Sequence, residues 1–192
     1  MWSSSVARLR FLRGFFRHPL AVGSIVPSSR YLSRAVVAPV PATARVVAEL
    51  GPGTGPITRA LLERLGPEAT VLALEIDPSF CEVLRRELPD PRLRVIQGPA
   101  QRLAERAREA GFPDGVDAVV SGLPFANFPV ALRYEMARIA YAGLEVGGVF
   151  SAYGYLPFAL PPVIRSVFGE CHSRHVWRNV PPAFVFSAAK RA

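Results

Sequence analysis

From Arg45 onward, apolar runs of strand length alternate with segments of helical periodicity, and this order limits the possible folds more than any other feature. The first four apolar runs are RVVAEL, TVLALEI, LRVIQ and GVDAVVSG. They are rich in β-branched residues and lack polar alternation, which is typical of strands buried on both faces. The intervening segments are TRALLERL, DPSFCEVLRREL and AQRLAERAREA. They place apolar residues at helical spacing, so the sequence predicts a parallel sheet covered by helices.

The remainder of the chain continues this order and then changes it. The next segments are the predicted helix VALRYEMARIAYAGL, the strand GGVFSAYGY, the helix LPPVIRSVFG, and the strands HSRHVWRNV and AFVFSAAKR. The last two strands are separated only by Pro181-Pro182, so we expect them to be antiparallel. The prediction is a doubly wound α/β fold with a mostly parallel seven-stranded sheet and helices on both faces. Ligands bind such sheets outside the carboxyl ends of the strands.

A glycine-rich loop, ELGPGTG at residues 49–55, follows the first strand directly. Glycines at this place let the backbone turn tightly and approach a ligand at a helix N-terminus. The dinucleotide fingerprint G-x-G-x-x-G is excluded because its third glycine is replaced by Pro56. A P-loop is excluded because no Gly-Lys-Ser/Thr sequence is present.

Two acidic residues flank this loop and indicate its ligand. Glu49 ends the first strand and Glu75 ends the second. One carboxylate can accept hydrogen bonds from a ribose diol and the other can hold an ammonium group, which together describe S-adenosylmethionine. ELGPGTG followed by ALEID resembles the class I methyltransferases, in which the loop holds the amino-acid end and the Glu75 position binds the ribose. The fold expected from this resemblance is Rossmann-like, and the product is S-adenosylhomocysteine.

The resemblance also implies the cofactor-binding residues. These are Glu49, Gly51, Pro52, Gly53, Thr54, Gly55, Glu75, Ile76, Gly98, Pro99, Ala100, Ser121, Gly122 and Leu123. In many relatives the third strand is followed by Gly-Asp-Ala, whose Asp reads the adenine amine, whereas this chain has Gly98-Pro99-Ala100. We expect backbone groups or Gln101 to read the adenine instead.

The fourth strand ends in SGLPFANFP at residues 121–129. Amino-methyltransferases often carry an Asn/Asp/Ser-x-Pro-aromatic motif here, whose oxygens orient the acceptor amine and stabilise the cation that forms. A primary ammonium must also lose a proton before it attacks, so a proton-accepting group is needed nearby. Candidate catalytic residues are Tyr31, Ser121, Leu123 and Tyr153, and Tyr155 is a further tyrosine placed at a strand end.

Two methyltransferase families share this motif. Ribosomal-RNA adenine dimethyltransferases usually have Asn-Leu-Pro-Tyr, where this chain has Ser121. The bacterial phospholipid N-methyltransferases of the soluble type are more similar, in FLRGFFRHPLAVGSIVPSSRYLSR, SGLPFANFP and WRNVPPAFVF. This resemblance implies successive methylation of phosphatidylethanolamine toward phosphatidylcholine. RNA methylation is the first alternative, and a non-catalytic lipid-binding protein with this fold is the second.

The resemblance also indicates contacts to the lipid phosphate. The candidates are Ser28, Ser29, Arg30, Arg178 and Asn179. Ser28 or Ser29 is also the expected N-cap of a short helix after Pro27. For Arg178 and Asn179, a simple role in capping the turn before Pro181 is the alternative.

The opening VARLRFLRGFFRHP has no acidic residue, and none occurs before Glu49. On a helical wheel its arginines flank a wide apolar arc, which is the pattern of a helix in a bilayer interface. The predicted membrane-contacting residues are Arg8, Arg10, Phe11, Arg13, Phe15, Phe16 and Arg17. A transit peptide and a nucleic-acid arm fit less well. That the segment forms a lid packed on the sheet remains an alternative. We expect residues 1–38 to form membrane-binding or lid helices and residues 39–192 the methyltransferase domain.

The net charge of +8 suggests a polyanionic partner, here an anionic phospholipid surface rather than nucleic acid. No apolar run is long enough to span a bilayer. Cys81 and Cys171 form no metal-ligand spacing, so we expect no metal and a reducing compartment. The sequence implies no protein partner. The expected location is the cytoplasm, at the inner leaflet of the cytoplasmic membrane.

Overall fold

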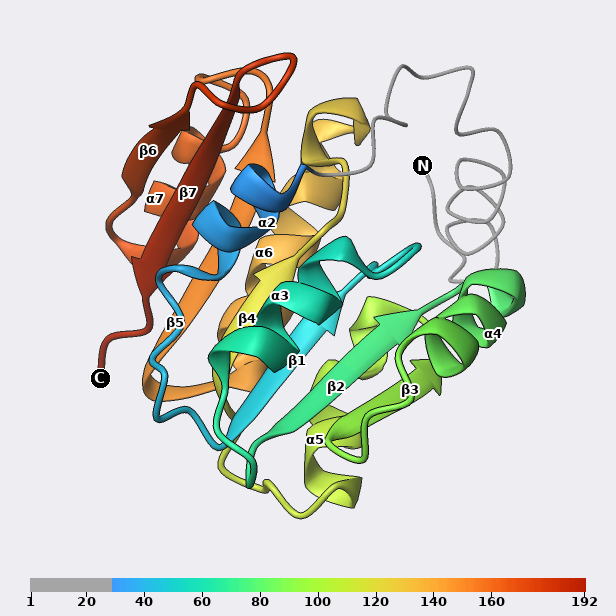
Figure 1. Ribbon diagram of the computed structural model, residues 1–192. Helices are drawn as coiled ribbons and strands as arrows, with labels where there is room; N and C mark the ends of the chain where they lie inside the picture. The colour runs from blue at the N-terminus through green and yellow to red at the C-terminus, as the bar shows by residue number, and fades with distance from the viewer. Residues whose placement is uncertain (1–28) are drawn as a thin grey trace.

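A computed structural model describes residues 29–192 of the chain (Figure 1). The predicted membrane-contacting residues of the opening segment and Ser28 lie outside the described residues. The strands are β1 (Val46–Leu50), β2 (Thr70–Glu75), β3 (Leu93–Gln97), β4 (Val116–Ser121), β5 (Leu144–Gly154), β6 (His172–Val176) and β7 (Ala183–Ala189). The helices are α2 (Arg30–Val37), α3 (Pro56–Arg64), α4 (Pro78–Glu87), α5 (Leu103–Glu109), α6 (Val130–Gly143) and α7 (Pro161–Phe168), with the short 3-10 helices η2 (Ala100–Arg102) and η3 (Phe125–Asn127).

The seven strands form one sheet in the order β3-β2-β1-β4-β5-β7-β6. Strands β1 to β5 pair in parallel, whereas β7 runs antiparallel to both β5 and β6. The predicted mostly parallel, seven-stranded sheet is confirmed, and so is the antiparallel pair at the end of the chain. The carboxyl ends of β1, β2 and β4 meet at the upper edge of the sheet in Figure 1.

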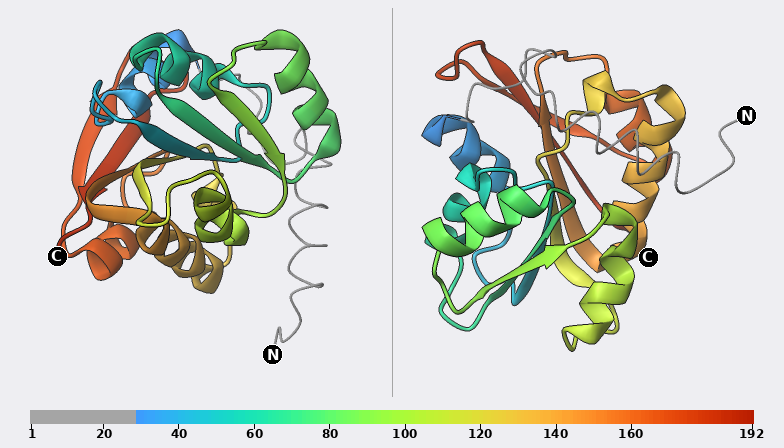
Figure 2. Two further views of the ribbon diagram at one scale, coloured as in Figure 1. Left: turned by 90° about the horizontal axis from the view of Figure 1, so that it is seen from below. Right: turned by 90° about the vertical axis from the view of Figure 1, so that its right-hand side faces the viewer.

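Helices cover both faces of the sheet (Figure 2). On one face Val47 and Val71 pack against apolar residues of α2 and α3. On the other face Ala48 and Leu72 belong to the core that includes α5, α6 and α7. Successive strand residues point to opposite faces, so the continuous apolar runs of the sequence supply both layers. Among the described residues, no helix has the length and the apolar character needed to cross a membrane.

Helix α2 packs within the first of these layers although its sequence belongs to the predicted 1–38 segment. Ser29 is its N-cap, accepting from the Leu32 N–H at 3.2 Å, which confirms one of the two expected caps. Leu32 and Val36 are fully buried, and the Ser151 hydroxyl of β5 donates to the Val36 carbonyl oxygen at 2.7 Å. Helix α4 likewise begins as predicted, with Asp77 as its cap and Pro78 at its first position.

The hairpin between β6 and β7 differs from the sequence prediction. HSRHVWRNV was expected to be one strand, but β6 ends at Val176. The Asn179 N–H bonds the Val176 carbonyl oxygen at 3.3 Å, and the Asn179 side chain is buried. The chain therefore turns inward at Asn179, and Trp177 to Pro182 form the tip of the hairpin.

Candidate functional site

The glycine loop lies where the carboxyl ends of three strands meet. The Gly51 N–H donates to the Leu74 carbonyl oxygen at 3.0 Å, and the Gly122 N–H donates to the Leu50 carbonyl oxygen at 2.9 Å. A Cβ on Gly122 would lie 2.5 Å from the Gly51 carbonyl oxygen, so the turn after β4 needs glycine to approach the loop. These contacts hold the loop against the neighbouring strand ends.

The loop backbone is left-handed at Gly51, Gly53 and Gly55, with φ of 70°, 56° and 85°. Only glycine adopts these angles without strain. A Cβ on Gly53 would meet no atom within 4 Å, whereas one on Gly55 would meet Leu84 and Leu88 at less than 3 Å. Gly55 is thus needed for packing, while Gly53 borders open space in which a ligand could approach the backbone.

Glu49 is buried at the end of β1 with half of its carboxylate unpaired. The Thr58 hydroxyl donates to Oε2 at 2.6 Å, while Oε1 has no hydrogen-bond partner among the described residues. Burial and, to a smaller degree, the charge of Glu75 raise the pKa of Glu49 to about 8, although the Thr58 hydrogen bond lowers it. A buried carboxylate without a partner is costly. A cationic ligand at Oε1 would remove that cost, so the site fits the ammonium end of S-adenosylmethionine.

We predict that cofactor binding near pH 7 releases about one proton from Glu49, because an ammonium ion favours its charged form. The measurement is calorimetry in buffers of different ionisation enthalpy. Glu49→Gln keeps the acceptor for Thr58 and should abolish this proton release.

In the free protein the raised pKa of Glu49 makes the free energy of unfolding fall as the pH rises from 4.5, the ordinary value, to about 8. If the difference in the free energy of unfolding between the unaltered protein and Glu49→Gln did not change with pH, the raised pKa of Glu49 would be contradicted.

Glu75 connects the second strand to the glycine loop. Its Oε2 accepts from the Gly53 N–H at 3.0 Å and its Oε1 accepts from the Asp77 N–H at 2.9 Å. Burial raises the pKa of Glu75, and these backbone hydrogen bonds lower it. The four lone pairs of the two oxygens outnumber the backbone hydrogen bonds that the carboxylate accepts. The carboxylate is therefore fixed beside the loop and can still accept the hydroxyl hydrogen bonds predicted for a ribose.

An apolar pocket lies at the carboxyl ends of β1, β2 and β3. It is lined by Gly51, Leu74, Ile76, Gly98, Pro99, Ala100, Leu123 and Met136. Six of these positions were predicted cofactor contacts, whereas Leu74 and Met136 were not, because nothing in the apolar periodicity separates pocket-lining from core residues. The Gln101 amide nitrogen donates to Glu135 Oε1 at 3.1 Å. With Pro99 in place of Asp, backbone groups are left as the expected contacts to the adenine edge.

The segment after β4 is held in place by hydrogen bonds between the Ser121 and Arg133 side chains and its own backbone. The Ser121 side chain is fully buried, and its hydroxyl oxygen accepts from the Leu123 N–H at 3.3 Å. Arg133 donates to the carbonyl oxygens of Phe128 and Ala126, both at 2.9 Å. Ser121 therefore shapes the turn and does not line the pocket described above, whereas Leu123 does. The catalytic roles predicted for both residues stay predictions.

A second cluster of polar residues joins α2 to the β6–β7 hairpin, 150 positions apart. The Ser29 hydroxyl donates to Asn179 Oδ1 at 2.6 Å, and Asn179 Nδ2 donates to the Pro181 carbonyl oxygen at 2.7 Å. Tyr155 shares a hydrogen bond with the Asn179 side chain, and burial raises its pKa. Tyr153 packs edge-on against Tyr155, with ring centroids 6.1 Å apart. The sequence proposed these residues separately, and the structure brings them together.

Two arginines contact the same tyrosine at this cluster. The guanidinium carbons of Arg30 and Arg178 lie 5.1 and 5.2 Å from the Tyr31 ring centroid, and Arg30 also donates to the Tyr31 hydroxyl at 3.2 Å. That hydrogen bond and the charges of both arginines lower the pKa of Tyr31. Within residues 29–192, neither arginine forms an ion pair with a carboxylate. The arginine pair, Arg30 and Arg178, can therefore bind an anionic group.

Comparisons with known proteins agree with this geometry. The methyltransferase domain family matches residues 47–148. The chain is 37% identical over 175 residues to an ornithine lipid N-methyltransferase from Singulisphaera acidiphila, covering 90% of this chain and 91% of that protein. It is 35% identical over 122 residues to ribosomal RNA small subunit methyltransferase A from Nocardia farcinica, covering 60% of this chain and 39% of that protein.

Solved structures share the fold at low sequence identity. A Burkholderia thailandensis 1,6-didemethyltoxoflavin-N1-methyltransferase with bound S-adenosylhomocysteine has a TM-score of 0.73 and 18% identity, covering all of this chain and 92% of that one. A spermidine synthase from Thermotoga maritima has a TM-score of 0.64 and 19% identity, covering 85% of this chain and 60% of that one. Both likenesses concern the fold and confirm the predicted Rossmann-like architecture.

Proposed function

The chain belongs to the methyltransferase domain family and uses S-adenosylmethionine as its cofactor, and on this premise we propose that it methylates the amino group of a lipid head group. The single observation that carries the proposal is the arginine pair at the carboxyl edge of the sheet. Likeness to an ornithine lipid N-methyltransferase over 90% of the chain supports it. A methyltransferase is also favoured over a non-catalytic lipid-binding protein.

Two lipid classes match the chemistry of the arginine pair. Phosphatidylethanolamine carries a primary amine next to a phosphate, and ornithine lipid carries a primary amine and a carboxylate. Arginine binds both anions through paired N–H donors. Arg30 and Arg178 would hold the anion of either lipid, while Ser29 and Asn179 fix the hairpin against α2. The amine would then extend toward the segment after β4.

The residues present suit methyl transfer to an amine. S-adenosylmethionine supplies an electrophilic methyl group when it is bound. Glu49 would hold the ammonium of the cofactor and Glu75 its ribose hydroxyls. The phenolate form of Tyr31, which Arg30 and Arg178 favour by lowering the pKa of the hydroxyl, would take the proton that the acceptor ammonium must lose. Methylation of a neutral amine by a positively charged donor needs no further reactant.

The lipid substrate also suggests where the enzyme works. The acyl chains of the acceptor stay in the bilayer, so the enzyme must reach the head group from the membrane surface. The predicted amphipathic opening segment would supply part of this attachment. We place the protein at the inner leaflet of the cytoplasmic membrane.

The proposal is tested by methyl transfer from labelled S-adenosylmethionine into three acceptors. Vesicles containing phosphatidylethanolamine, vesicles containing ornithine lipid, and ribosomal RNA are compared, and lipid products are separated by chromatography. We expect label in at least one lipid, and the mono-, di- and trimethyl products show which steps occur. The ribosomal RNA methyltransferase relatives make RNA the second candidate. Label in RNA alone, or in no acceptor, would overturn the proposal.

A further inference from the structure

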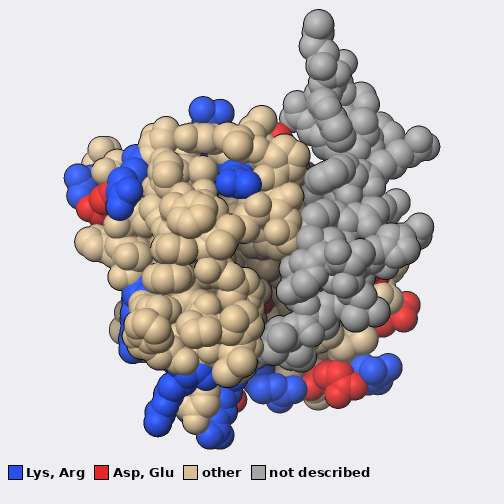
Figure 3. All heavy atoms as spheres, turned by 90° about the horizontal axis from the view of Figure 1, so that it is seen from above, with Lys and Arg blue, Asp and Glu red and all other residues tan. Residues whose placement is uncertain are grey.

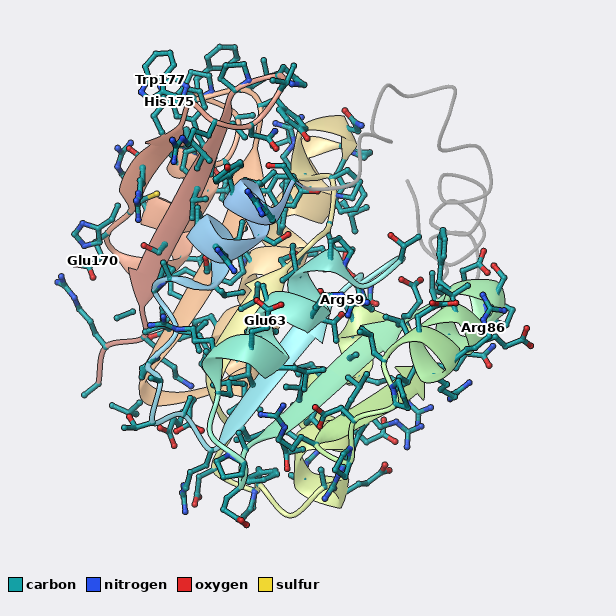
Figure 4. The ribbon with its side chains drawn as sticks, viewed as in Figure 1. Arg59, Glu63, Arg86, Glu170, His175 and Trp177 are labelled. Atoms are coloured by element: carbon teal, nitrogen blue, oxygen red, sulfur yellow. The ribbon has the colours of Figure 1, made fainter. Side chains whose placement is uncertain are left out.

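Five large apolar side chains project from the carboxyl edge of the sheet. They are Val130 (61% exposed), Leu156 (44%), Phe158 (70%), Trp177 (74%) and Val180 (79%). We call this set the apolar rim. It comes from three separate places: the start of α6, the connection between β5 and α7, and the tip of the β6–β7 hairpin. Figure 4 shows Trp177 at the upper end of this hairpin, beside His175.

The rim is built on a supported backbone. Arg133 holds the segment before α6 through the carbonyl oxygens of Ala126 and Phe128. At the hairpin, the Asn179 side chain holds the Pro181 carbonyl oxygen, and Trp177 packs against His175 with ring centroids 3.5 Å apart. A groove between the first two places is lined by Val130, Tyr134, Leu156 and Phe158 among others. Large apolar side chains held outward on supported loops indicate a partner that takes them up.

The segments that carry the rim contain basic residues but no acidic ones. Neither 121–134, nor 147–169, nor 171–192 contains an Asp or Glu, and the first acidic residue after Ser29 is Glu49. Arg30 and Arg178, the arginine pair, lie on this edge without an ion pair to any described carboxylate. Figure 3 looks down on this face and shows a broad uncharged surface with blue groups, and red mainly at its margins.

We propose that the apolar rim inserts into the interface of an anionic phospholipid bilayer, with the arginine pair at the level of the head groups. This inference rests on the proposed function and names its partner. Apolar tips surrounded by cationic side chains match the two layers of a bilayer surface, in which acyl chains lie beneath anionic head groups. Nucleic acid would match the arginines, and its bases could stack on Phe158 and Trp177. It offers nothing comparable to the exposed aliphatic side chains of Val130, Leu156 and Val180. A protein partner is an outcome of the test below.

This surface is formed by residues of the folded domain, and none of them belongs to the opening segment. Two members of the rim, Trp177 and Val180, flank Arg178 in the hairpin, so insertion would bring the arginine pair to the head groups of the same leaflet. The lipid would then need to rise only partly from the bilayer to reach the site. The rim therefore orients the enzyme, whereas the predicted amphipathic opening segment would add affinity.

Trp177 gives a direct test because the chain has only two tryptophans, Trp2 and Trp177. The variant Trp2→Phe leaves Trp177 as the single reporter. With vesicles of phosphatidylglycerol and phosphatidylethanolamine, we expect a blue shift of its emission and quenching by brominated acyl chains. Unchanged and unquenched emission, while the protein still sediments with the vesicles, would overturn the inference, because another segment would then carry the binding.

A pair of variants tests the effect on activity. Phe158→Asp combined with Val180→Asp places two charges in the rim, and Val146→Asp is the control because Val146 is 64% exposed near the opposite end of β5. We expect the double variant to lose about 100-fold in vesicle binding. Its methyl transfer to vesicles should fall in parallel, while transfer to a monomeric short-chain lipid and cofactor binding should match the control.

The outcomes separate this inference from the proposed function. If no lipid is methylated but Trp177 is quenched by brominated chains, the lipid substrate is wrong and the rim stands. If the double variant binds and methylates vesicles as well as the control does, the rim is wrong and the lipid substrate stands. Unchanged vesicle binding together with loss of a copurifying protein would show a protein-docking surface and would also overturn the inference.

Discussion

Gly53→Val is expected to remove S-adenosylmethionine binding, with a loss of at least about 100-fold in affinity measured by calorimetry. Gly53 has φ of +56°, so a β-branched residue is strained there by about 1–3 kcal/mol. Its Cβ would also enter the open space beside the loop, where the cofactor is expected to approach. The backbone strain would also disturb the hydrogen bond from the Gly53 N–H to Glu75, the predicted ribose contact. Strain and lost space therefore both weaken cofactor binding.

Gly111→Val is the matched control for this variant. Gly111 also has positive φ, at +97°, and a Cβ there would likewise meet no atom within 4 Å. It follows α5, away from the carboxyl edge of the sheet. Both variants should lose similar stability in thermal unfolding, but only Gly53→Val should lose cofactor binding. Equal affinities for the two would show that the loop does not hold the cofactor.

The second large effect is expected for the arginine pair. Arg30→Ala and Arg178→Ala each remove a charged hydrogen-bond donor, which contributes about 1.5–3 kcal/mol to binding an anion. Each single variant should therefore raise the KM for the lipid about tenfold to 100-fold, and the double variant more. Cofactor binding should stay unchanged, because both residues belong to the cluster at α2 and the β6–β7 hairpin.

Arg34→Ala separates this effect from a general loss of positive charge. Arg34 lies on the same helix as Arg30, but its side chain is exposed and pairs with Glu63 at 3.8 Å. Its loss should change the KM less than twofold at physiological salt, because exposed ion pairs and distant charges are screened. If Arg34→Ala were as damaging as Arg178→Ala, the arginines would act only through net charge.

Much of the fold could be predicted because its determinants are local. Continuous β-branched runs gave the parallel strands, and Asp77-Pro78 gave the start of α4, since caps and periodicity depend on residues within a few positions. The glycine loop and its two carboxylates were found for the same reason. The end of β6 was predicted wrongly, because Asn179 turns inward to Ser29, a partner 150 positions away that the local pattern does not contain.

The sequence by itself determined the fold class, the cofactor loop and the residue types of the site, because these depend on spacing along the chain. Only the tertiary structure decided which residues meet. The raised pKa of Glu49 needs burial beneath the loop, and the pairing of Arg30 with Arg178 around Tyr31 needs β7 beside β5 and α2 over both. The apolar rim likewise joins three loops that the order of the strands brings to one edge, and no local pattern encodes that order.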